Sequence, residues 1–114
     1  MRIFEWFEDA RHFFMITDLY QGNELFHFIK KQAHKSDGVP GIVSEDDARE
    51  IVRQILVILK YVHGKGIVHR DIKPENLIFI EKDNIGKGIV LIDFGLARKL
   101  DHGSYLKDKQ GTAY

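Results

Sequence analysis

The sequence predicts an α+β fold, and three features of its 114 residues indicate this class. Short runs rich in aromatic residues open the chain, a long helical repeat of apolar residues occupies its middle, and two short branched-residue runs follow that helix. Strand-like and helical segments that each need a partner for an apolar face form one packed domain. The 44% hydrophobic and 30% charged residues are ordinary for a folded chain, and the length suits one small domain.

The first part of the chain predicts a strand hairpin and a short helix. Residues 2–7 and 12–19 are predicted strands, and the polar residues 8–11 form the connection that a hairpin requires. Asn23 is a suitable helix N-cap. The helix that it precedes runs to about Ala33, with apolar residues at helical spacing at Leu25, Phe28 and Ile29.

A glycine- and proline-containing loop at 34–43 separates this helix from a longer one. Ser44 and Asp47 resemble a capping box, and Gly64 and Gly66 end the helical pattern about 20 residues later. Its apolar stripe predicts an amphipathic helix that serves as core scaffold; the stripe comprises Ala48, Ile51, Val52, Ile55, Ile58, Leu59 and Val62.

Two buried strands are predicted after the long helix. Residues 77–80 and 89–92 are short, continuous runs of branched and aromatic residues, which is typical of strands that are covered on both faces. The polar, glycine-containing residues 81–88 connect them, so a second hairpin is expected. Residues 99–110 are polar and unpatterned, and are predicted as a loop.

Composition and charge exclude several classes of function. The chain has no cysteine, which removes disulfide scaffolds and thiolate metal sites. Residues 1–57 carry 7 basic and 10 acidic side chains (net −3) and residues 58–114 carry 10 and 7 (net +3), too weak a bias to predict nucleic-acid binding. No run approaches the roughly 18–20 apolar residues of a membrane span, and no signal peptide is evident. We therefore expect a soluble, cytoplasmic protein.

Polar clusters bracket the second hairpin. The run 69–76 (His-Arg-Asp-Ile-Lys-Pro-Glu-Asn) precedes it and Asp93-Phe94-Gly95 follows it. Because a hairpin returns the chain to where it left, Asp71, Lys73, Asn76 and Asp93 are expected to converge. Asn76 and Asp93 offer the hard oxygen ligands that Mg²⁺ prefers, and Lys73 offers a charge for a phosphate. With Asp71 as a base, these are the parts that phosphoryl transfer needs.

These clusters resemble the catalytic loop and metal-binding motif of protein kinases. The first contains His69-Arg70-Asp71 with Asn76 five residues after the aspartate, and Asp93-Phe94-Gly95 is the second. Lys73 is typical of the serine/threonine kinases, and residues 111–114 (Gly-Thr-Ala-Tyr) resemble the segment that leads into the kinase Ala-Pro-Glu motif. The resemblance extends over essentially the whole chain.

The resemblance implies a catalytic role for Asp71, Lys73, Asn76 and Thr112. Asp71 would orient and deprotonate the substrate hydroxyl, Lys73 would steady the γ-phosphate of ATP, and Thr112 would hydrogen-bond to both. Asn76 and Asp93 would hold Mg²⁺. The same resemblance implies a regulatory role for Arg70, Phe94 and Gly95. Arg70 would anchor the activation segment. His69 is expected to pack against Phe94 rather than to act as a base.

The resemblance also implies an ATP site. Thr17 would be the gatekeeper, Asp18 and Tyr20 would offer backbone groups to adenine, Glu24 would lie near the ribose, and Ile78 would form the floor under the base. The complete set of expected nucleotide contacts is Asp18, Tyr20, Glu24, Glu75, Asn76, Ile78 and Asp93. Ser104 and Tyr105 are exposed-loop hydroxyls that could be phosphorylated, although a plain solvated loop is the simpler interpretation.

Within the kinases, the sequence resembles most the calcium/calmodulin-dependent group, and above all the calcium-dependent protein kinases. Residues 22–26, 73–77 and 111–114 carry this likeness. Calcium-dependent kinases hold EF-hands outside the kinase domain, and this chain has no EF-hand loop sequence. A regulatory calcium-binding region is therefore expected outside this chain, and no direct calcium binding is predicted within it.

We expect the chain to be a partial kinase domain. Residues 1–20 would be the last strands of the upper lobe and the hinge, and residues 21–114 would run from the start of the helical lower lobe through the activation segment. The Gly-rich phosphate loop and its partner lysine have no counterpart in the sequence, which predicts weak MgATP binding by residues 1–114 alone.

The predicted activity is transfer of the γ-phosphoryl group of ATP to Ser or Thr of a protein substrate. Two alternatives stay open. The chain could be an inactive, kinase-like binding piece. It could also be a small-molecule phosphotransferase, since antibiotic kinases share a related His-x-Asp and Asn pattern. Arg70 and the runs 73–75 and 111–112 favour protein substrates.

Overall fold

A computed structural model describes residues 1–33, 43–100, 106 and 110–112. Most of the predicted 34–43 loop, Ser104 and Tyr105 lie outside the described residues. The chain forms β1 (Ile3–Glu8), β2 (Phe13–Thr17), α1 (Leu25–Ala33), α2 (Glu45–Gly64), β3 (Ile67–Val68), β4 (Leu77–Phe79), β5 (Ile89–Leu91) and β6 (Arg98–Lys99), with single 3-10 turns η1 (Pro74–Asn76) and η2 (Ile85–Lys87). The predicted α+β class is confirmed. No described helix is long and apolar enough to cross a membrane.

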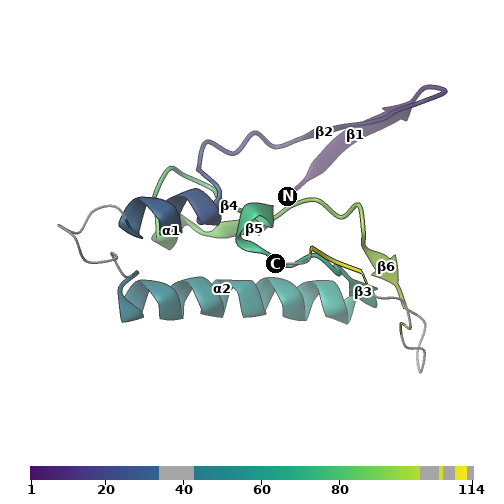
Figure 1. The fold of residues 1–114 in the computed structure, drawn as a ribbon. Helices are drawn as coiled ribbons and strands as arrows, with labels where there is room; N and C mark the ends of the chain where they lie inside the picture. The colour runs from purple at the N-terminus through teal and green to yellow at the C-terminus, as the bar shows by residue number, and fades with distance from the viewer. Residues whose placement is uncertain (34–42, 101–105, 107–109, 113–114) are drawn as a thin grey trace.

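β1 and β2 form the predicted N-terminal hairpin, which extends away from the two helices (Figure 1). The turn is closed by the carboxylate of Asp9, which accepts hydrogen bonds from the backbone N–H groups of Arg11 at 2.7 Å and His12 at 2.8 Å. β2 ends two residues earlier than predicted. At that point the Asp18 side chain turns back and accepts the backbone N–H of Arg2 at 2.8 Å. The aromatic side chains of the hairpin are exposed on both of its faces.

α1 buries Leu25 and Phe28 and packs on β4. The prediction that Asn23 caps this helix was wrong. The first helical hydrogen bond runs from the Phe28 N–H to the Glu24 carbonyl at 3.2 Å, so Glu24 takes the cap position. The carbonyl of Asn23 instead accepts the N–H of Phe79 at 3.1 Å, because the chain here lies along the edge of β4.

α2 begins at the predicted cap, where the Ser44 hydroxyl accepts the Asp47 N–H at 3.1 Å, and it ends at Gly64. Ile51 and Val62 are buried. The buried face is narrower than the predicted stripe, since Val52 is 53% exposed. Other large apolar side chains of this helix are also exposed, namely Leu56, Val57 and Tyr61.

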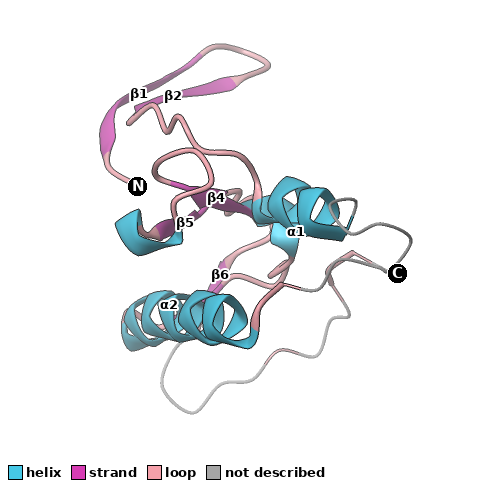
Figure 2. Ribbon diagram, turned by 90° about the vertical axis from the view of Figure 1, so that its left-hand side faces the viewer, coloured by secondary structure: helices cyan, strands magenta, loops and turns pink. Residues whose placement is uncertain are grey.

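The hairpin of β4 and β5 lies at the centre of the fold, with β4 toward α1 and β5 toward α2 (Figure 2). It pairs antiparallel as predicted, with Leu77 opposite Leu91 and Phe79 opposite Ile89. Phe79 is completely buried and meets Phe28 edge to face, with ring centroids 5.2 Å apart. The core cluster comprises Leu25, Phe28, Ile51, Leu77, Phe79, Ile89 and Leu91.

A third strand pair was not predicted from the sequence. β3 pairs with β6, so that Ile67 lies opposite Lys99 and Val68 opposite Arg98. The N–H of Leu100 continues this pairing to the Gly66 carbonyl at 2.7 Å. The predicted loop at 99–110 is therefore wrong at its start. A two-residue strand is too short to show any alternation in sequence, and only the pairing reveals it.

Candidate active site

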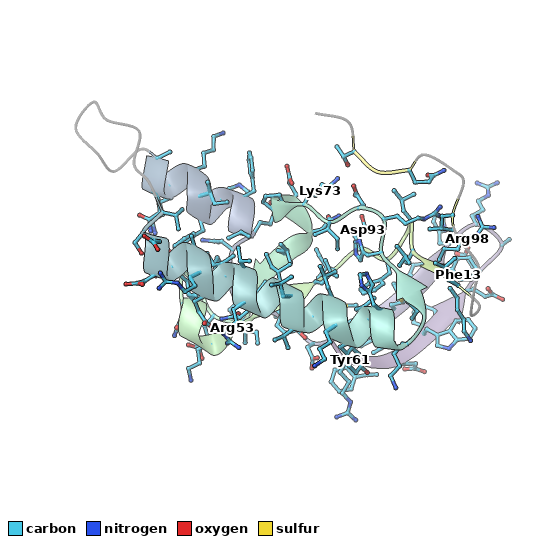
Figure 3. The ribbon with its side chains drawn as sticks, turned by 90° about the horizontal axis from the view of Figure 1, so that it is seen from below. Phe13, Arg53, Tyr61, Lys73, Asp93 and Arg98 are labelled. Atoms are coloured by element: carbon cyan, nitrogen blue, oxygen red, sulfur yellow. The ribbon has the colours of Figure 1, made fainter. Side chains whose placement is uncertain are left out.

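The central hairpin brings the two polar clusters to one end of the fold, as the sequence predicted. The pairing continues one step beyond the strands, because the Ile92 N–H donates to the Asn76 carbonyl at 2.9 Å. The loop that contains Asp71 and the turn that contains Asp93 therefore start from adjacent positions. Lys73 and Asp93 can be found at this end in Figure 3.

Asp71 is the centre of a dense hydrogen-bond network. Its Oδ1 accepts the Thr112 N–H at 3.0 Å and the Thr112 hydroxyl at 2.8 Å. Its Oδ2 accepts the side-chain amide of Asn76 at 3.0 Å and pairs with the Lys73 ammonium at 2.9 Å. Lys73 also donates to the Thr112 hydroxyl at 2.6 Å, which closes a ring of three side chains. The structure thus brings together all four residues that the sequence assigned to catalysis.

This network lowers the pKa of the Asp71 carboxyl group. The Lys73 ammonium, and after it the Thr112 hydroxyl, lower the pKa of the Asp71 carboxyl from 3.8 to about 2. Hydrogen bonds from the Thr112 N–H and from Asn76 act in the same direction, and partial burial opposes them. Asp71 is ionised at neutral pH, and the lowered pKa makes it a weaker proton acceptor than an ordinary carboxylate.

Asn76 and Asp93 present oxygen atoms that suit a hard cation. The buried Asn76 commits its amide nitrogen to the carbonyl of Asp71 at 2.9 Å and to its carboxylate, so the carboxamide oxygen is its remaining ligand atom. Asp93 has a positive φ of 57°, and its Oδ1 accepts the Gly95 N–H at 3.1 Å. Its second carboxylate oxygen has no hydrogen-bond partner within the part of the chain that the structure describes. Two such ligands fit Mg²⁺, which binds through few protein oxygens together with phosphates and water. No group of three His, Asp or Glu side chains that could hold a metal is found among the described residues.

His69 joins the two loops instead of facing a substrate. It is only 1% exposed, and its ring meets Phe94 edge to face at 4.7 Å, as the sequence analysis expected. Nε2 lies 2.9 Å from the carbonyl of Ile92, which can only accept, and Nδ1 lies 3.3 Å from the Asp71 N–H, which can only donate. Both contacts are satisfied by a neutral imidazole protonated at Nε2. His69 therefore holds the backbone of Asp71 against the segment that precedes Asp93.

Arg70 contacts the segments that follow Asp93. Its backbone has a positive φ of 72°, and its Nε donates to the Leu96 carbonyl at 2.5 Å. Gly111 lies against the Arg70 carbonyl, since a Cβ there would be 3.0 Å from that oxygen, and its φ is 120°. Gly111 was not predicted to be a site residue, although it belongs to the kinase-like run 111–114.

The expected nucleotide contacts fall into two groups. Glu24 and Ile78 form an isolated antiparallel bridge, so the predicted ribose and adenine positions are direct neighbours. Asp18 and Tyr20 lie together at the end of the N-terminal hairpin, where the Tyr20 hydroxyl donates to the Asp18 carboxylate at 3.1 Å. Glu75 lies in η1, partly buried, immediately before Asn76.

An apolar cavity of about 900 Å³ borders the site on the side of the N-terminal hairpin. Side chains of that hairpin, of α2 and of β5 line it, together with Asp93, Phe94 and Gly95. Of the predicted nucleotide contacts, Asp93 alone is part of this lining. The cavity is therefore a neighbour of the expected nucleotide position rather than that position itself.

Comparison with known proteins identifies the family to which this fold belongs. A family model described as protein kinase domain matches residues 1–114, and the chain belongs to this family. It is 38% identical over 114 residues to calcium-dependent protein kinase 4 of Plasmodium falciparum, covering 100% of this chain and 20% of that protein.

Other relatives belong to neighbouring kinase groups. The chain is 40% identical over 98 residues to calcium/calmodulin-dependent protein kinase cmkA of Emericella nidulans, covering 86% of this chain and 22% of that protein. It is 38% identical over 112 residues to serine/threonine-protein kinase RAD53 of Saccharomyces cerevisiae, covering 98% of this chain and 12% of that protein. The predicted resemblance to the calcium- and calmodulin-dependent kinases is confirmed. The chain spans about a fifth of the length of the first of these relatives.

Proposed function

We propose that this chain carries the catalytic loop, the metal-binding motif and part of the activation segment of a serine/threonine protein kinase. The reaction is transfer of the γ-phosphoryl group of MgATP to a Ser or Thr hydroxyl of a protein. The observation that supports it best is the network in which Lys73, Asn76 and Thr112 all contact the carboxylate of Asp71. Family membership and the serine/threonine kinases among the relatives support the same activity.

In the proposed reaction, Asp71 orients the attacking hydroxyl. The hydroxyl oxygen forms a bond to the γ-phosphorus as the bond from that phosphorus to the bridging oxygen of ADP breaks. The hydroxyl proton passes to Asp71. A carboxylate with a pKa of about 2 is a weak base. The transition state of phosphoryl transfer is loose, so the proton can move late and orientation contributes more than base strength.

The four donors around Asp71 have a consequence for substrate binding. Two of them come from Thr112, and both contact Oδ1. An incoming hydroxyl must share or displace one of these donors, because a carboxylate has about four acceptor positions. Thr112 is the neighbour best placed to yield, since it belongs to a separate segment, whereas Lys73 and Asn76 belong to the same loop as Asp71.

Lys73 and the two oxygen ligands provide the positive charge. Lys73 stabilises the transferred phosphate as a point charge and aligns Thr112 with Asp71. Asn76 and Asp93 would hold Mg²⁺, which when bound neutralises charge on the β- and γ-phosphates. Glu24 and Ile78 would contact the ribose and the adenine, and Asp18 and Tyr20 would bind adenine through their backbone. Glu75 completes the proposed nucleotide set.

Regulation is proposed for the residues around the metal-binding turn. Arg70 contacts the Leu96 carbonyl and would anchor the activation segment, while Phe94 and Gly95 would set the position of Asp93. Because relatives are named calcium-dependent and calcium/calmodulin-dependent kinases, we include a calcium-responsive region outside this chain in the proposal.

Asp71→Asn tests the proposed function. With the protein as its gene encodes it, transfer of labelled γ-phosphate to Ser- and Thr-containing peptides is measured for the wild type and for the variant. Loss of a proton acceptor predicts a rate that is roughly 10²–10⁴-fold lower. Asp46→Asn is the matched control, because the same change falls on an exposed carboxylate of α2, and its rate should equal that of the wild type. A wild type without phosphotransfer, or an Asp71→Asn variant with undiminished rate, would refute the proposal.

A further inference from the structure

Gly22 lies closer to its surroundings than any side chain permits. A Cβ built on Gly22 would be 1.9 Å from the carbonyl oxygen of Phe79 and 2.5 Å from its carbonyl carbon. Phe79 is completely buried in the core, so this backbone cannot move aside cheaply. The φ of Gly22 is not among the positive values that the structure describes. Glycine is required here because a Cβ would clash, and not because the backbone conformation is unusual.

The close approach lets the segment before α1 lie along β4 as an additional edge. The Phe79 N–H donates to the Asn23 carbonyl at 3.1 Å, and Glu24 forms its antiparallel bridge with Ile78. β4 is thereby held between β5 on one side and residues 22–24 on the other. A side chain at position 22 would push this segment away from β4 and break both contacts.

The segment is also held at its far end. Leu25 and Phe28 are buried next to β4, and Lys31 forms an ion pair with Asp83 of the loop between β4 and β5. The side chain of Glu24 remains 41% exposed and lies 3.2 Å from His27. Glu24 is therefore fixed through its backbone, while its carboxylate stays accessible to a ligand.

We propose that Gly22 is a positioning residue for nucleotide binding. By bringing residues 22–24 onto β4, it fixes the separation between the Glu24 carboxylate and the Ile78 side chain, the two groups proposed to contact the ribose and the adenine. This inference rests on the proposed function. It adds a residue with no side chain of its own to the determinants of ATP affinity.

The test is Gly22→Ala, with Gly64→Ala as the matched control, because nothing lies within 4 Å of a Cβ at Gly64. With the protein as its gene encodes it, calorimetry with Mg²⁺ and a non-hydrolysable ATP analogue gives nucleotide affinity, and steady-state kinetics gives kcat and KM for ATP and for peptide. Gly22→Ala should weaken analogue binding and raise the KM for ATP roughly tenfold, the equivalent of about one hydrogen bond to a charged group. kcat and the KM for peptide should stay within about twofold, and Gly64→Ala should match the wild type in every quantity.

A double-mutant cycle with Glu24→Gln separates positioning from general damage. If Gly22 acts through Glu24, adding Gly22→Ala to Glu24→Gln should weaken analogue binding by much less than it does in the wild type. Equal losses in both backgrounds, or equal losses in kcat and both KM values, would mean a merely structural role and would overturn the inference.

The two proposals fail in different ways. A wild-type protein that binds no analogue refutes the proposed function, whereas a wild type that binds and a Gly22→Ala variant of equal affinity refute the role of Gly22 alone. Should the variant fail to fold, amide hydrogen exchange on the wild type decides. Analogue binding is expected to slow exchange at the Phe79 N–H, and unchanged exchange in the presence of bound analogue would refute the inference.

Discussion

Replacing Phe79 by alanine should remove a large part of the stability of this fold. The side chain is 0% exposed and meets Phe28 edge to face at 5.2 Å. Truncation of a buried phenylalanine loses its transfer free energy and leaves a cavity, which together cost about 3–5 kcal/mol. Domains are stable by only about 5–15 kcal/mol, so this loss is a large fraction of the total.

Urea unfolding followed by far-UV circular dichroism measures this loss. Phe26→Ala is the matched control, because Phe26 lies on the same helix as Phe28 but is 39% exposed and contacts Lys30. We expect Phe26→Ala to cost about 1 kcal/mol or less. The Phe28→Ala and Phe79→Ala pair should show a coupling free energy of about 0.5–1.5 kcal/mol. A Phe79→Ala variant that loses no more stability than Phe26→Ala would show that the core is not centred on β4.

Three further predictions concern the site and the helix ends. Carboxyl NMR should show that Asp71 titrates near pH 2, and Lys73→Met should raise this pKa. Because the pKa is lowered in the folded state, the contribution of Asp71 to stability is present above pH 3.8 and is lost as the pH falls toward 2. A titration at 3.8 in the wild type would contradict this network. Ser44→Ala should lower the free energy of unfolding by about 1 kcal/mol, and Ser44→Asp should restore it; equal stability of all three proteins would show that the cap is unimportant. Gly66→Ala should cost about 1–2 kcal/mol in the same urea assay, since its φ is 70° and a Cβ would lie 3.1 Å from the Leu100 carbonyl, and Gly64→Ala should cost clearly less.

Local patterns were sufficient for the long helix, the two main hairpins and the polar clusters of the site. The cap of α2 could be predicted because the Ser44 hydroxyl bonds the N–H of a residue only three positions later, and this contact needs no other part of the fold. The clusters around Asp71 and Asp93 could be placed together from sequence, since a hairpin between them fixes which end of the strands they share. Their chemistry, and the resemblance to kinases, also depended on residue types and spacing alone.

Features that depend on contacts between residues distant in sequence could not be predicted from the sequence. Asn23 is a residue type that favours the cap position. Its carbonyl instead accepts the N–H of Phe79, which is distant in sequence, and Glu24 takes the cap position. The two-residue pairing of β3 with β6 and the exposure of Val52 were likewise decided by packing partners that a local pattern does not contain.

The sequence by itself determined the fold class, the kinase family and the candidate reacting groups, because these depend on periodicity and on which side chains stand at which spacing. The tertiary structure decided how far the pKa of Asp71 is lowered, since this depends on donors from Lys73 and from Thr112, which is 41 residues away in sequence. It also decided that position 22 must be a glycine, because only the folded backbone of Phe79 shows how little space is left there. Both properties depend on how the folded chain places its groups against one another, which residue types alone do not show.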